Sequence, residues 1–482
     1  MKDYSKIAKE VDAIESKIWD VASNIWEFAE QGYHEVKSSA YASEALESEG
    51  FKITDRGIGT IDTSWIATWG SGSPVLGLMA EYDALPGLGN DTQPKKTPAK
   101  SGNTSGHGCG HNLICSTSVG AAIALKNHME KENIKGTIKV VGTPAEELLN
   151  GKNYMAAAGA FKDMDVILHN HPTPKNSVWN FHSNAAMDMW IEFKGTAAHA
   201  GLQPWDGRSA LHALEVFLTG VNAMREQMIP EARMHYQILS GGAAVNTIPD
   251  YTKVLIRYRG PNAENVRKHK EWIKDIAKGA ALATQTESVF TNLGGIYDCL
   301  PNDVLAERVT DHLHKYFPLD FTEEEQAHAK GTQTEMGVAQ DGMAADVSPV
   351  PYGVSIGASS DVGDVSWQKP TMGVIYSSWP LNVPAHTWGA TACNGMSIGH
   401  KATVAAAKTM AATGLDLLTD PDFLQKTKDE FVKQLDGRTY KTLNDSDTNI
   451  QGKLDTKDQK LFECSIHGAM EHFGMPEHHH DH

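Results

Sequence analysis

The stretch TIKVVGTPAEE, residues 137–147, joins a short apolar run to a proline turn and two adjacent carboxylates. Two other stretches are built alike: VLGLMAEYD at residues 75–83 ends in acids, and VILHNHP at residues 166–172 ends in histidines. Short apolar runs of this kind are typical of strands buried within a sheet. A helical stretch at residues 112–130 alternates with them, and this alternation predicts an α/β domain with parallel strands.

Each expected strand carries its acids or histidines at the carboxyl end. In open sheets with parallel strands, ligands bind outside that end, because the loops there converge on one crevice. One such coincidence would mean little, but three in succession predict an active site along one edge of the sheet.

The sequence pattern changes near residue 184. Residues 184–298 follow the order strand, helix, strand, strand, helix, which predicts a small inserted α+β domain. The flanking residues 1–183 and 299–482 then form the first and second parts of a catalytic domain, the second part with a C-terminal extension. The expected fold class is therefore α/β, with a mixed, largely parallel sheet and a smaller inserted domain.

Composition argues against several functional classes. Hydrophobic residues make up 40% and charged residues 21% of the chain, as in ordinary globular proteins. No apolar run is long enough to span a bilayer, and the charged N-terminus lacks the features of a signal peptide, so we expect a cytoplasmic protein. The net charge of −17 argues against nucleic acid or an anionic membrane as a partner. The few, irregularly spaced cysteines argue against a disulfide framework.

The stretch GHGCGHN, residues 106–112, places Cys109 and His111 two positions apart between glycines. Thiolate and imidazole are ligands that borderline cations such as Zn²⁺ accept, and the glycines permit the bend that would turn both toward one ion. The positive N-terminus of the following helix, near Asn112, would favour the thiolate. Taken alone, the stretch leaves open a flexible glycine loop with an incidental thiol.

Glu146 and Glu147 form the second candidate feature. Adjacent side chains at the end of a strand point to opposite sides, so one carboxylate can bind a metal while the other serves as general base. The alternative is a helix N-terminus, where glutamate is favoured by the helix dipole. The neighbouring Cys109 and His111 favour the catalytic interpretation.

Five further residues complete the candidate site. His169 and His171 precede a proline at a strand end, as in a ligand loop in which one of the two binds. Asp83 is placed to orient a ligating imidazole, or simply caps a loop. His386 is a lone histidine after a late strand. His199 lies among small residues of the insert, where it is either an oxyanion donor or a surface residue.

In this order the motifs resemble those of the aminoacylase and carboxypeptidase family of metallopeptidases, especially its amidohydrolase branch and, within that branch, the B-type subunits of p-aminobenzoyl-glutamate hydrolase. The likeness runs from about residue 10 to about residue 415. The matching motifs are AEYDALP at 80–86, GCGHN at 108–112, PAEE at 144–147, His-Pro at 171–172, GTAAHA at 195–200 and the late histidine at 386.

The resemblance implies a centre of two divalent metal ions per subunit, commonly zinc or manganese. Glu146 would be the general base, and Asp83 would support a ligand. His171 is preferred to His169 because it lies six residues after Asp165, the usual spacing in the family. The implied ligands are Cys109, which would bridge or ligate, together with His111, Glu147, His171 and His386.

The resemblance also makes the insert a dimerisation, or lid, domain. His199 would contact the substrate's carboxylate or the tetrahedral oxyanion, often across a dimer interface, and Asn246 would be another polar contact. We therefore expect a homodimer, or a dimer with a paralogous subunit. The implied reaction is hydrolysis of the amide of an N-acyl or aroyl amino acid, p-aminobenzoyl-glutamate for example, or of a small dipeptide.

The sequence departs from the family pattern at four places. Asn112 stands where many relatives have aspartate, and the loop 87–105 is long. His169 offers a second candidate ligand that many relatives lack, and the chain continues well beyond Asp416. Two other functions stay open at this point: a hydrolase that uses Cys109 as nucleophile, and a non-catalytic or partner-dependent subunit of a heteromeric hydrolase.

Overall fold

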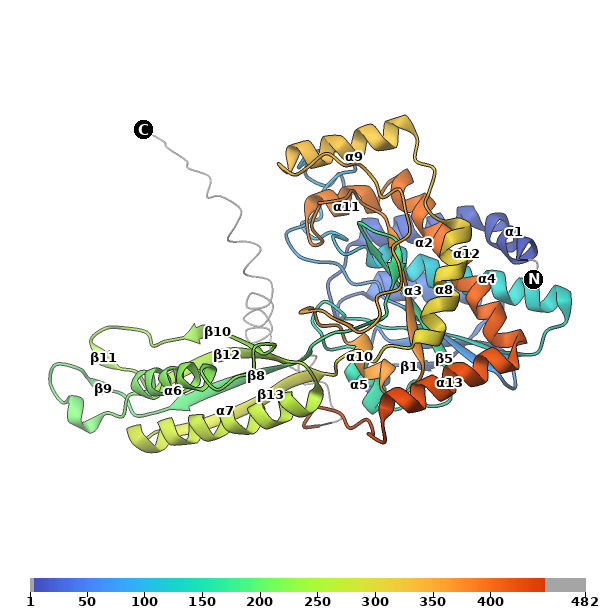
Figure 1. The fold of residues 1–482 in the computed structure, drawn as a ribbon. Coiled ribbons are helices and arrows are strands. Elements are labelled where there is room, and N and C mark those ends of the chain that lie inside the picture. Colours follow the sequence, from blue (N-terminus) through green and yellow to red (C-terminus); the bar gives the residue numbers. More distant parts are fainter. Residues whose placement is uncertain (1–3, 447–482) are drawn as a thin grey trace, which may run out of the picture. The chain divides into compact units, whose positions relative to one another are not determined.

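The computed structural model describes residues 4–446, which fall into two compact units. Within the described residues, the first unit comprises 4–182, 300–354 and 364–440, and the second comprises 183–299, 355–363 and 441–446. Figure 1 shows both, coloured along the chain. The sequence-based domain boundaries stay a prediction. The end of the expected C-terminal extension, beyond residue 446, lies outside the described residues.

A seven-stranded sheet in the order β1-β2-β4-β3-β5-β15-β6 forms the centre of the first unit. The inner strands β4, β3, β5 and β15 are parallel, whereas β1, β2 and β6 join antiparallel. This confirms the expected mixed α/β sheet. The strands are β1 (Lys52–Arg56), β2 (Trp65–Ser71), β3 (Val75–Ala80), β4 (Gly136–Gly142), β5 (Val166–Thr173), β6 (Ser177–Val178) and β15 (Thr371–Ser377).

The registers bring the carboxyl ends of the parallel strands to one edge. Ala80, the last residue of β3, lies opposite Gly142, the last residue of β4. Likewise, His171 in β5 lies opposite Ile375 in β15. The acids and histidines that follow or end these strands are thereby placed side by side, as parallel pairing requires.

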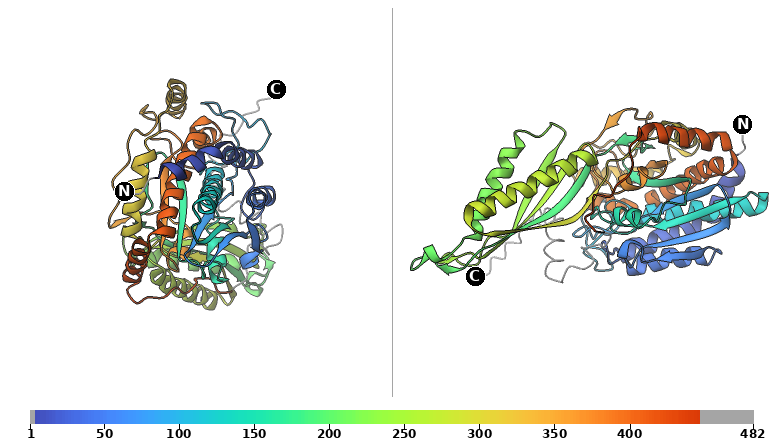
Figure 2. Two further views of the ribbon diagram at one scale, coloured as in Figure 1. Left: turned by 90° about the vertical axis from the view of Figure 1, so that its right-hand side faces the viewer. Right: turned by 90° about the horizontal axis from the view of Figure 1, so that it is seen from below.

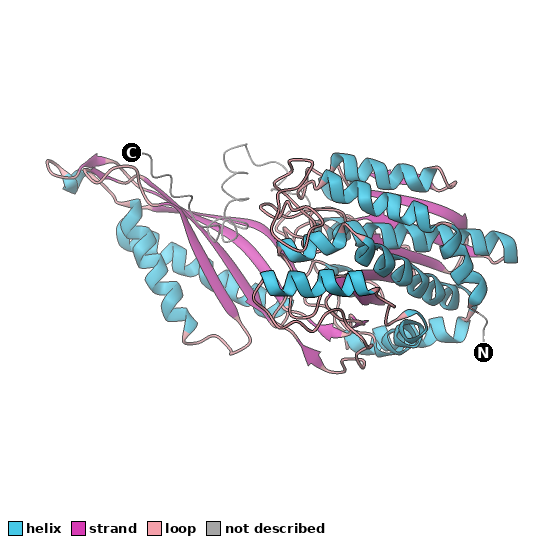
Figure 3. Ribbon diagram, turned by 90° about the horizontal axis from the view of Figure 1, so that it is seen from above, coloured by secondary structure: helices cyan, strands magenta, loops and turns pink. Residues whose placement is uncertain are grey.

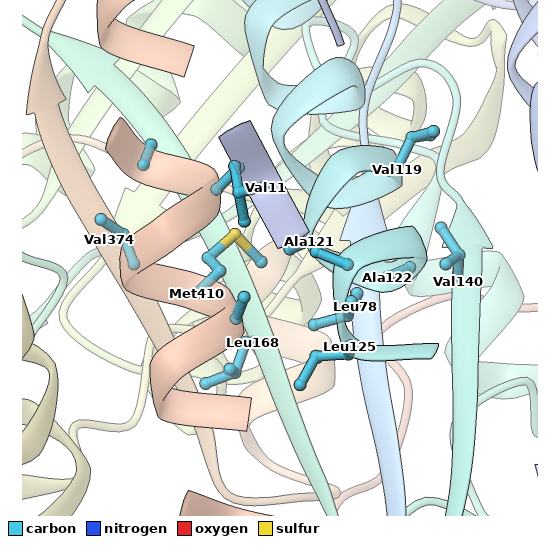
Figure 4. Packing of buried hydrophobic residues seen from close by; sticks show 14 of the residues in the cluster. Val11, Leu78, Val119, Ala121, Ala122, Leu125, Val140, Leu168, Val374 and Met410 are labelled. Atoms are coloured by element: carbon cyan, nitrogen blue, oxygen red, sulfur yellow. The ribbon is translucent and has the colours of Figure 1, made fainter. Parts of the chain in front are cut away.

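Two long helices, α4 (His111–Glu132) and α12 (Ser397–Thr419), pack against the inner strands and against each other. Figure 4 shows Leu78 and Leu168 of the sheet against Leu125 of α4 and Met410 of α12. Both helices carry many small side chains, alanine above all in α12, so their backbones approach closely and bury apolar surface on most sides. None of the helices within residues 4–446 combines the length and apolar character that a membrane crossing requires.

The remaining helices surround this core or belong to the second unit. They are α1 (Ser5–Ala13), α2 (Glu15–Phe28), α3 (Val36–Glu47), α5 (Lys152–Ala157), α6 (Ala210–Arg225), α7 (Ala263–Thr284), α8 (Asp303–Tyr316), α9 (Glu323–Glu335), α10 (Val362–Ser366), α11 (Trp388–Asn394) and α13 (Pro421–Leu435), with short 3₁₀ turns at Ile58–Thr60 and Pro204–Asp206.

The second unit contains a four-stranded antiparallel sheet in the order β10-β12-β8-β13. Helices α6 and α7 lie side by side along the strands (Figure 2) and cover one face of the sheet (Figure 3). A small ribbon, β9 with β11, adds to this unit. The expected α+β insert is confirmed. The other strands are β7 (Phe181–His182), β8 (Ala185–Lys194), β9 (Ala198–His199), β10 (Arg233–Ser240), β11 (Thr247–Ile248), β12 (Tyr251–Gly260), β13 (Glu287–Ile296) and β14 (Val354–Ser355).

Asp416, near the end of α12, ties three helical elements of the first unit together. Its buried carboxylate accepts hydrogen bonds from the Tyr4 hydroxyl at 2.8 Å, from Arg308 Nη1 at 2.7 Å and from His312 Nε2 at 2.9 Å. Burial alone would raise the pKa of Asp416, but these hydrogen bonds outweigh it and hold the pKa below its usual value. The carboxylate therefore stabilises the fold in its ionised form.

We predict that Asp416→Asn lowers the free energy of unfolding by about 3 kcal/mol at pH 7, because it leaves the partly buried Arg308 guanidinium uncompensated. Since the folded-state pKa is depressed, this stabilisation is present above the ordinary carboxyl pKa and is lost as the pH falls below it. Urea unfolding at pH 7 and pH 3 should show the difference between wild type and variant shrinking in acid. The exposed neighbour Asp311→Asn serves as control, and equal losses for both variants would contradict the prediction.

Candidate metal centre

A tight glycine turn places Cys109 and His111 at the start of α4. Gly110 adopts a left-handed backbone, with φ of 79°, and an added Cβ there would lie 2.5 Å from the Pro172 ring. Only glycine meets both conditions. His111 then begins the helix, so its backbone is rigidly held while Cys109 projects from the turn.

Asn112 stabilises this turn through two side-chain hydrogen bonds. Its Nδ2 donates to the carbonyl oxygens of Ala22 at 3.2 Å and Asn394 at 3.1 Å. An ionised aspartate has no hydrogen to donate, so it would face two carbonyl oxygens without satisfying them. The departure from the family's usual aspartate therefore has a structural reason here.

Asp83 holds two candidate metal-binding residues at once. Its Oδ1 lies 2.9 Å from His111 Nδ1, and its Oδ2 accepts a hydrogen bond from the Glu147 backbone N–H at 2.9 Å. Carboxylate contacts of this kind orient a ligating imidazole and leave its other nitrogen free to bind. Among the described residues, His111 Nε2 and Glu147 Oε1 are buried and have no hydrogen-bond partner.

Three carboxylate oxygens surround His111 Nε2. Glu147 Oε1 lies at 3.6 Å, Glu81 Oε2 at 3.7 Å and Glu146 Oε2 at 3.9 Å. These separations are too long for hydrogen bonds. Donor atoms that share a tetrahedral ion at bonds of about 2.1 Å lie about 3.4 Å apart, so the spacing fits a divalent cation between them.

Cys109 belongs to two candidate ligand groups. One joins it with His111 and His171, and the other joins it with Glu147 and His386; within each group the ligand atoms lie within 4.8 Å of one another. Cys109 Sγ is 3.5 Å from His171 Nε2, and Glu147 Oε2 is 3.5 Å from His386 Nε2. A thiolate shared by two such groups fits two neighbouring cations, and the mixed S, N and O donors suit borderline ions.

The structure distinguishes the two histidines of β5. His171 Nδ1 lies 2.7 Å from the Pro172 carbonyl oxygen, so Nδ1 carries the hydrogen and Nε2 offers its lone pair to the site. Burial lowers the pKa of His171 to about 4, which keeps the ring neutral at pH 7. His169 joins none of the candidate ligand groups found among the described residues; its ring packs against Trp179 and over Gly373.

Glu35 supports the turn that presents the two glutamates, and no motif in the sequence pointed to it. Ala145 has a left-handed backbone, with φ of 59°, and its N–H donates to Glu35 Oε1 at 2.8 Å. The other oxygen of Glu35 accepts from the Thr63 hydroxyl at 2.9 Å. Burial, together with the nearby Asp83, raises the pKa of Glu35 to about 8.

Glu81 and Lys152 form a second pair that sequence reasoning missed. Lys152 Nζ lies 2.7 Å from Glu81 Oε1, and both side chains are buried. Glu81 stands in the same EYD stretch as Asp83, but no pattern in the sequence distinguishes it as part of the site. Lys152 begins α5, shortly after Glu147, with no pattern that marks it as part of the site.

His199 and Asn246 belong to the second unit, where the structure brings them together in the β9/β11 ribbon. The backbone N–H of Ala200 donates to the Asn246 carbonyl at 2.9 Å. His199 Nδ1 accepts from the N–H groups of Gly201 and Leu202, each at 3.1 Å. This fixes the tautomer in which Nε2 carries the hydrogen, so the exposed ring offers a donor.

Comparison with known proteins agrees with this geometry. A model of the peptidase dimerisation domain matches residues 182–285. Over 466 residues the chain is 34% identical to the B-type subunit of p-aminobenzoyl-glutamate hydrolase from Escherichia coli (strain K12), covering 91% of this chain and 96% of that protein. The chain belongs to the M20 peptidase family. The resemblance proposed from the motifs is thus confirmed, and the protein is a metal-dependent amidohydrolase of this family.

Other similar proteins share less of the sequence. The chain is 28% identical to the Xaa-Arg dipeptidase of Mus musculus, covering 89% of this chain and 92% of the relative. A crystal structure of an aminobenzoyl-glutamate utilization protein from Klebsiella pneumoniae shares the fold, with a TM-score of 0.58, 18% identity and coverage of 86% of this chain and 98% of that one.

We predict that Cys109→Ala lowers the bound divalent metal from about two ions per chain to one or none, because a shared thiolate is lost from both ligand groups. Metal should be measured by inductively coupled plasma mass spectrometry after reconstitution with zinc or manganese. Cys115→Ala, a buried thiol in α4 that belongs to neither group, is the matched control. Unchanged metal content in Cys109→Ala would refute the shared-ligand assignment.

Proposed function

We propose that this M20 protein hydrolyses the amide bond of an N-acyl or aroyl amino acid, or of a small dipeptide, with Glu146 as general base. The observation that carries the proposal is a buried donor set. His111 Nε2 and Glu147 Oε1 lie 3.6 Å apart without hydrogen-bond partners among the described residues, and His111 Nε2 lies 3.9 Å from Glu146 Oε2. The names of the relatives, p-aminobenzoyl-glutamate hydrolase, Xaa-Arg dipeptidase and hippurate hydrolase, support this class of substrate.

In this proposal the ligands are Cys109, His111, Glu147, His171 and His386, and they hold two divalent cations. Such cations would polarise the scissile carbonyl and lower the pKa of a bound water. The thiolate favours zinc and the carboxylates favour manganese, so the donor set accepts either ion.

Glu146 transfers the proton in this reaction. Its carboxylate takes the proton of the attacking water and then delivers it to the nitrogen of the leaving amine. The carboxylate is positioned by the left-handed turn at Ala145, which Glu35 holds through the backbone. A general base fixed in this way loses little entropy on reaching the reacting geometry.

His199 and Asn246 supply the polar contacts for the substrate. We assign His199 Nε2–H to the substrate's carboxylate or to the oxyanion, because its tautomer is fixed as a donor. We further propose a homodimer, with a paralogous subunit as the alternative partner. The edge strand β10 supports this, since it exposes the apolar side chains Tyr236 and Ile238 beside an edge that no described strand pairs with.

An aromatic pair beside His171 supports an aroyl substrate. The Trp179 ring lies 5.3 Å from the His171 ring and 4.7 Å from the Phe181 ring, measured between centroids, and both aromatic residues are half-buried. A planar aromatic acyl group held next to a ligand histidine can stack on such rings, which is worth about 1 kcal/mol per pair.

The alternatives have less support. Burial, reinforced by Glu147, raises the pKa of the Cys109 thiol, so without a cation it is a poor nucleophile at neutral pH. A non-catalytic subunit would have no need for the complete donor set beside Glu146 and Glu147. Chelation by EDTA should accordingly abolish activity.

We predict that Glu146→Gln reduces kcat by about 10²- to 10⁴-fold, the usual contribution of a general base, while metal content stays unchanged. Steady-state hydrolysis of p-aminobenzoyl-glutamate or another active substrate gives kcat, and mass spectrometry gives the metal content. Glu130→Gln, at the exposed end of α4, is the control. Full activity in Glu146→Gln would remove Glu146 from the mechanism.

We also predict that Trp179→Ala lowers kcat/KM about tenfold for aroyl substrates and much less for N-acetyl substrates, because only the former lose a stacking contact. Comparing p-aminobenzoyl-glutamate with N-acetylglutamate on the same variant corrects for any general loss of activity. Equal losses on both substrates would contradict a role in recognising the aromatic group.

A further inference from the structure

Glu81 presents its two carboxylate oxygens to different partners. It follows the last residue of β3, and its side chain is buried. Oε1 lies 2.7 Å from Lys152 Nζ, whereas Oε2 lies 3.7 Å from His111 Nε2. One oxygen is thus held by a cation of the chain, and the other faces a buried imidazole nitrogen that has no hydrogen-bond partner among the described residues.

A purely stabilising role explains this arrangement poorly. Removing the charged groups of a lysine and a glutamate from water is costly, and a buried ion pair often stabilises a fold no better than packed apolar side chains. The pair is also not remote from the candidate centre. Glu81, His111 and Glu146 form a third group whose ligand atoms lie within 4.8 Å of one another.

We propose that Glu81 is an additional carboxylate ligand of the metal centre, on its His111 side, and that Lys152 is the positioning residue that turns Oε2 toward the ion. This rests on the proposed metal centre. Lys152 occupies the outer oxygen of Glu81, so the carboxylate cannot rotate away from His111 without breaking a buried ion pair.

Charge balance explains how a lysine is tolerated so close to cations. Two divalent cations together with the Lys152 ammonium balance the five negative charges around them. Those charges are the Cys109 thiolate and the carboxylates of Glu81, Asp83, Glu146 and Glu147. Without Lys152, the ionised Glu81 would leave a buried net negative charge, which is costly in a low dielectric.

A carboxylate ligand from Glu81 would change the metal preference of the centre. Cys109, His111 and His171 are sulfur and nitrogen donors, which favour zinc on this side. An oxygen donor from Glu81 adds a hard ligand and raises the coordination number. The site with Glu81 should therefore bind Mn²⁺ more tightly than the same site without it. The substitution of one side chain should therefore change the ratio of the two affinities rather than metal binding in general.

The double variant Glu81→Gln/Lys152→Met tests the proposal, because it removes both charges together and leaves no uncompensated ion in the interior. Metal-free protein should be titrated calorimetrically with Mn²⁺ and with Zn²⁺, and bound metal counted by mass spectrometry. Thermal unfolding of the metal-free proteins checks that the variant folds. We expect the dissociation constant for Mn²⁺ to rise at least about tenfold, and that for Zn²⁺ to rise less.

The control is an ion pair of the second unit between buried Asp188 and half-buried Arg257, whose Oδ2 and Nη2 lie 2.6 Å apart. Asp188→Asn/Arg257→Met should leave both metal affinities unchanged. Lys152→Arg, which keeps the positive charge, should retain more Mn²⁺ affinity than Lys152→Met.

The outcomes separate this proposal from the proposed function. Mn²⁺ and Zn²⁺ affinities of the Glu81→Gln/Lys152→Met variant within twofold of wild type would show that the pair is structural only. Wild-type protein that binds neither ion would instead overturn the metal centre itself. If the variant fails to fold, Glu81→Gln alone is titrated, and an unchanged ratio of the two affinities then overturns the proposal.

Discussion

The carboxylate of Asp83 is the interaction on which the candidate centre depends. It fixes the His111 ring through Nδ1 and the Glu147 backbone through its N–H, so it joins the end of β3, the start of α4 and the turn after β4. Burial would raise the pKa of Asp83, but His111 and the Glu147 N–H outweigh it, and the pKa lies below its usual value. The carboxylate therefore stays ionised and holds both His111 and Glu147 in place.

The parts of the site that follow from local rules were predictable from the sequence. Apolar runs end in acids and histidines, and parallel strands gather those ends at one edge, so the neighbourhood of Cys109, His111 and Glu147 could be foreseen. Glu35 could not, because it meets Ala145 across 110 residues of chain and no periodicity links the two. Lys152 could not be predicted for a related reason. It begins α5, whereas its partner Glu81 follows β3, and only the fold brings the two side chains together.

The choice between His169 and His171 shows the limit more sharply. Both lie on the same face of β5, because side chains alternate along a strand. The hydrophobic pattern alone therefore cannot decide which of the two histidines is the ligand. The difference arises partly from the neighbouring strand. Gly373 of β15 has no side chain, which leaves space for the His169 ring to pack over it. The Pro172 carbonyl holds the hydrogen of His171 on Nδ1, so that Nε2 is left to face Cys109 Sγ. The motif spacing favoured His171, but the space that accepts His169 is provided by β15, a strand far along the chain.

The centre also collects features that cost stability. Ala145 and His386 have left-handed backbones, with φ of 59° and 60°, and buried polar atoms of His111 and Glu147 lack hydrogen-bond partners in the described chain. Each such feature costs about 1–3 kcal/mol. The close packing of α4 and α12 in the core of the first unit offsets this cost. A cation bound to these atoms would satisfy them, so we expect metal binding to add to the stability of the folded chain.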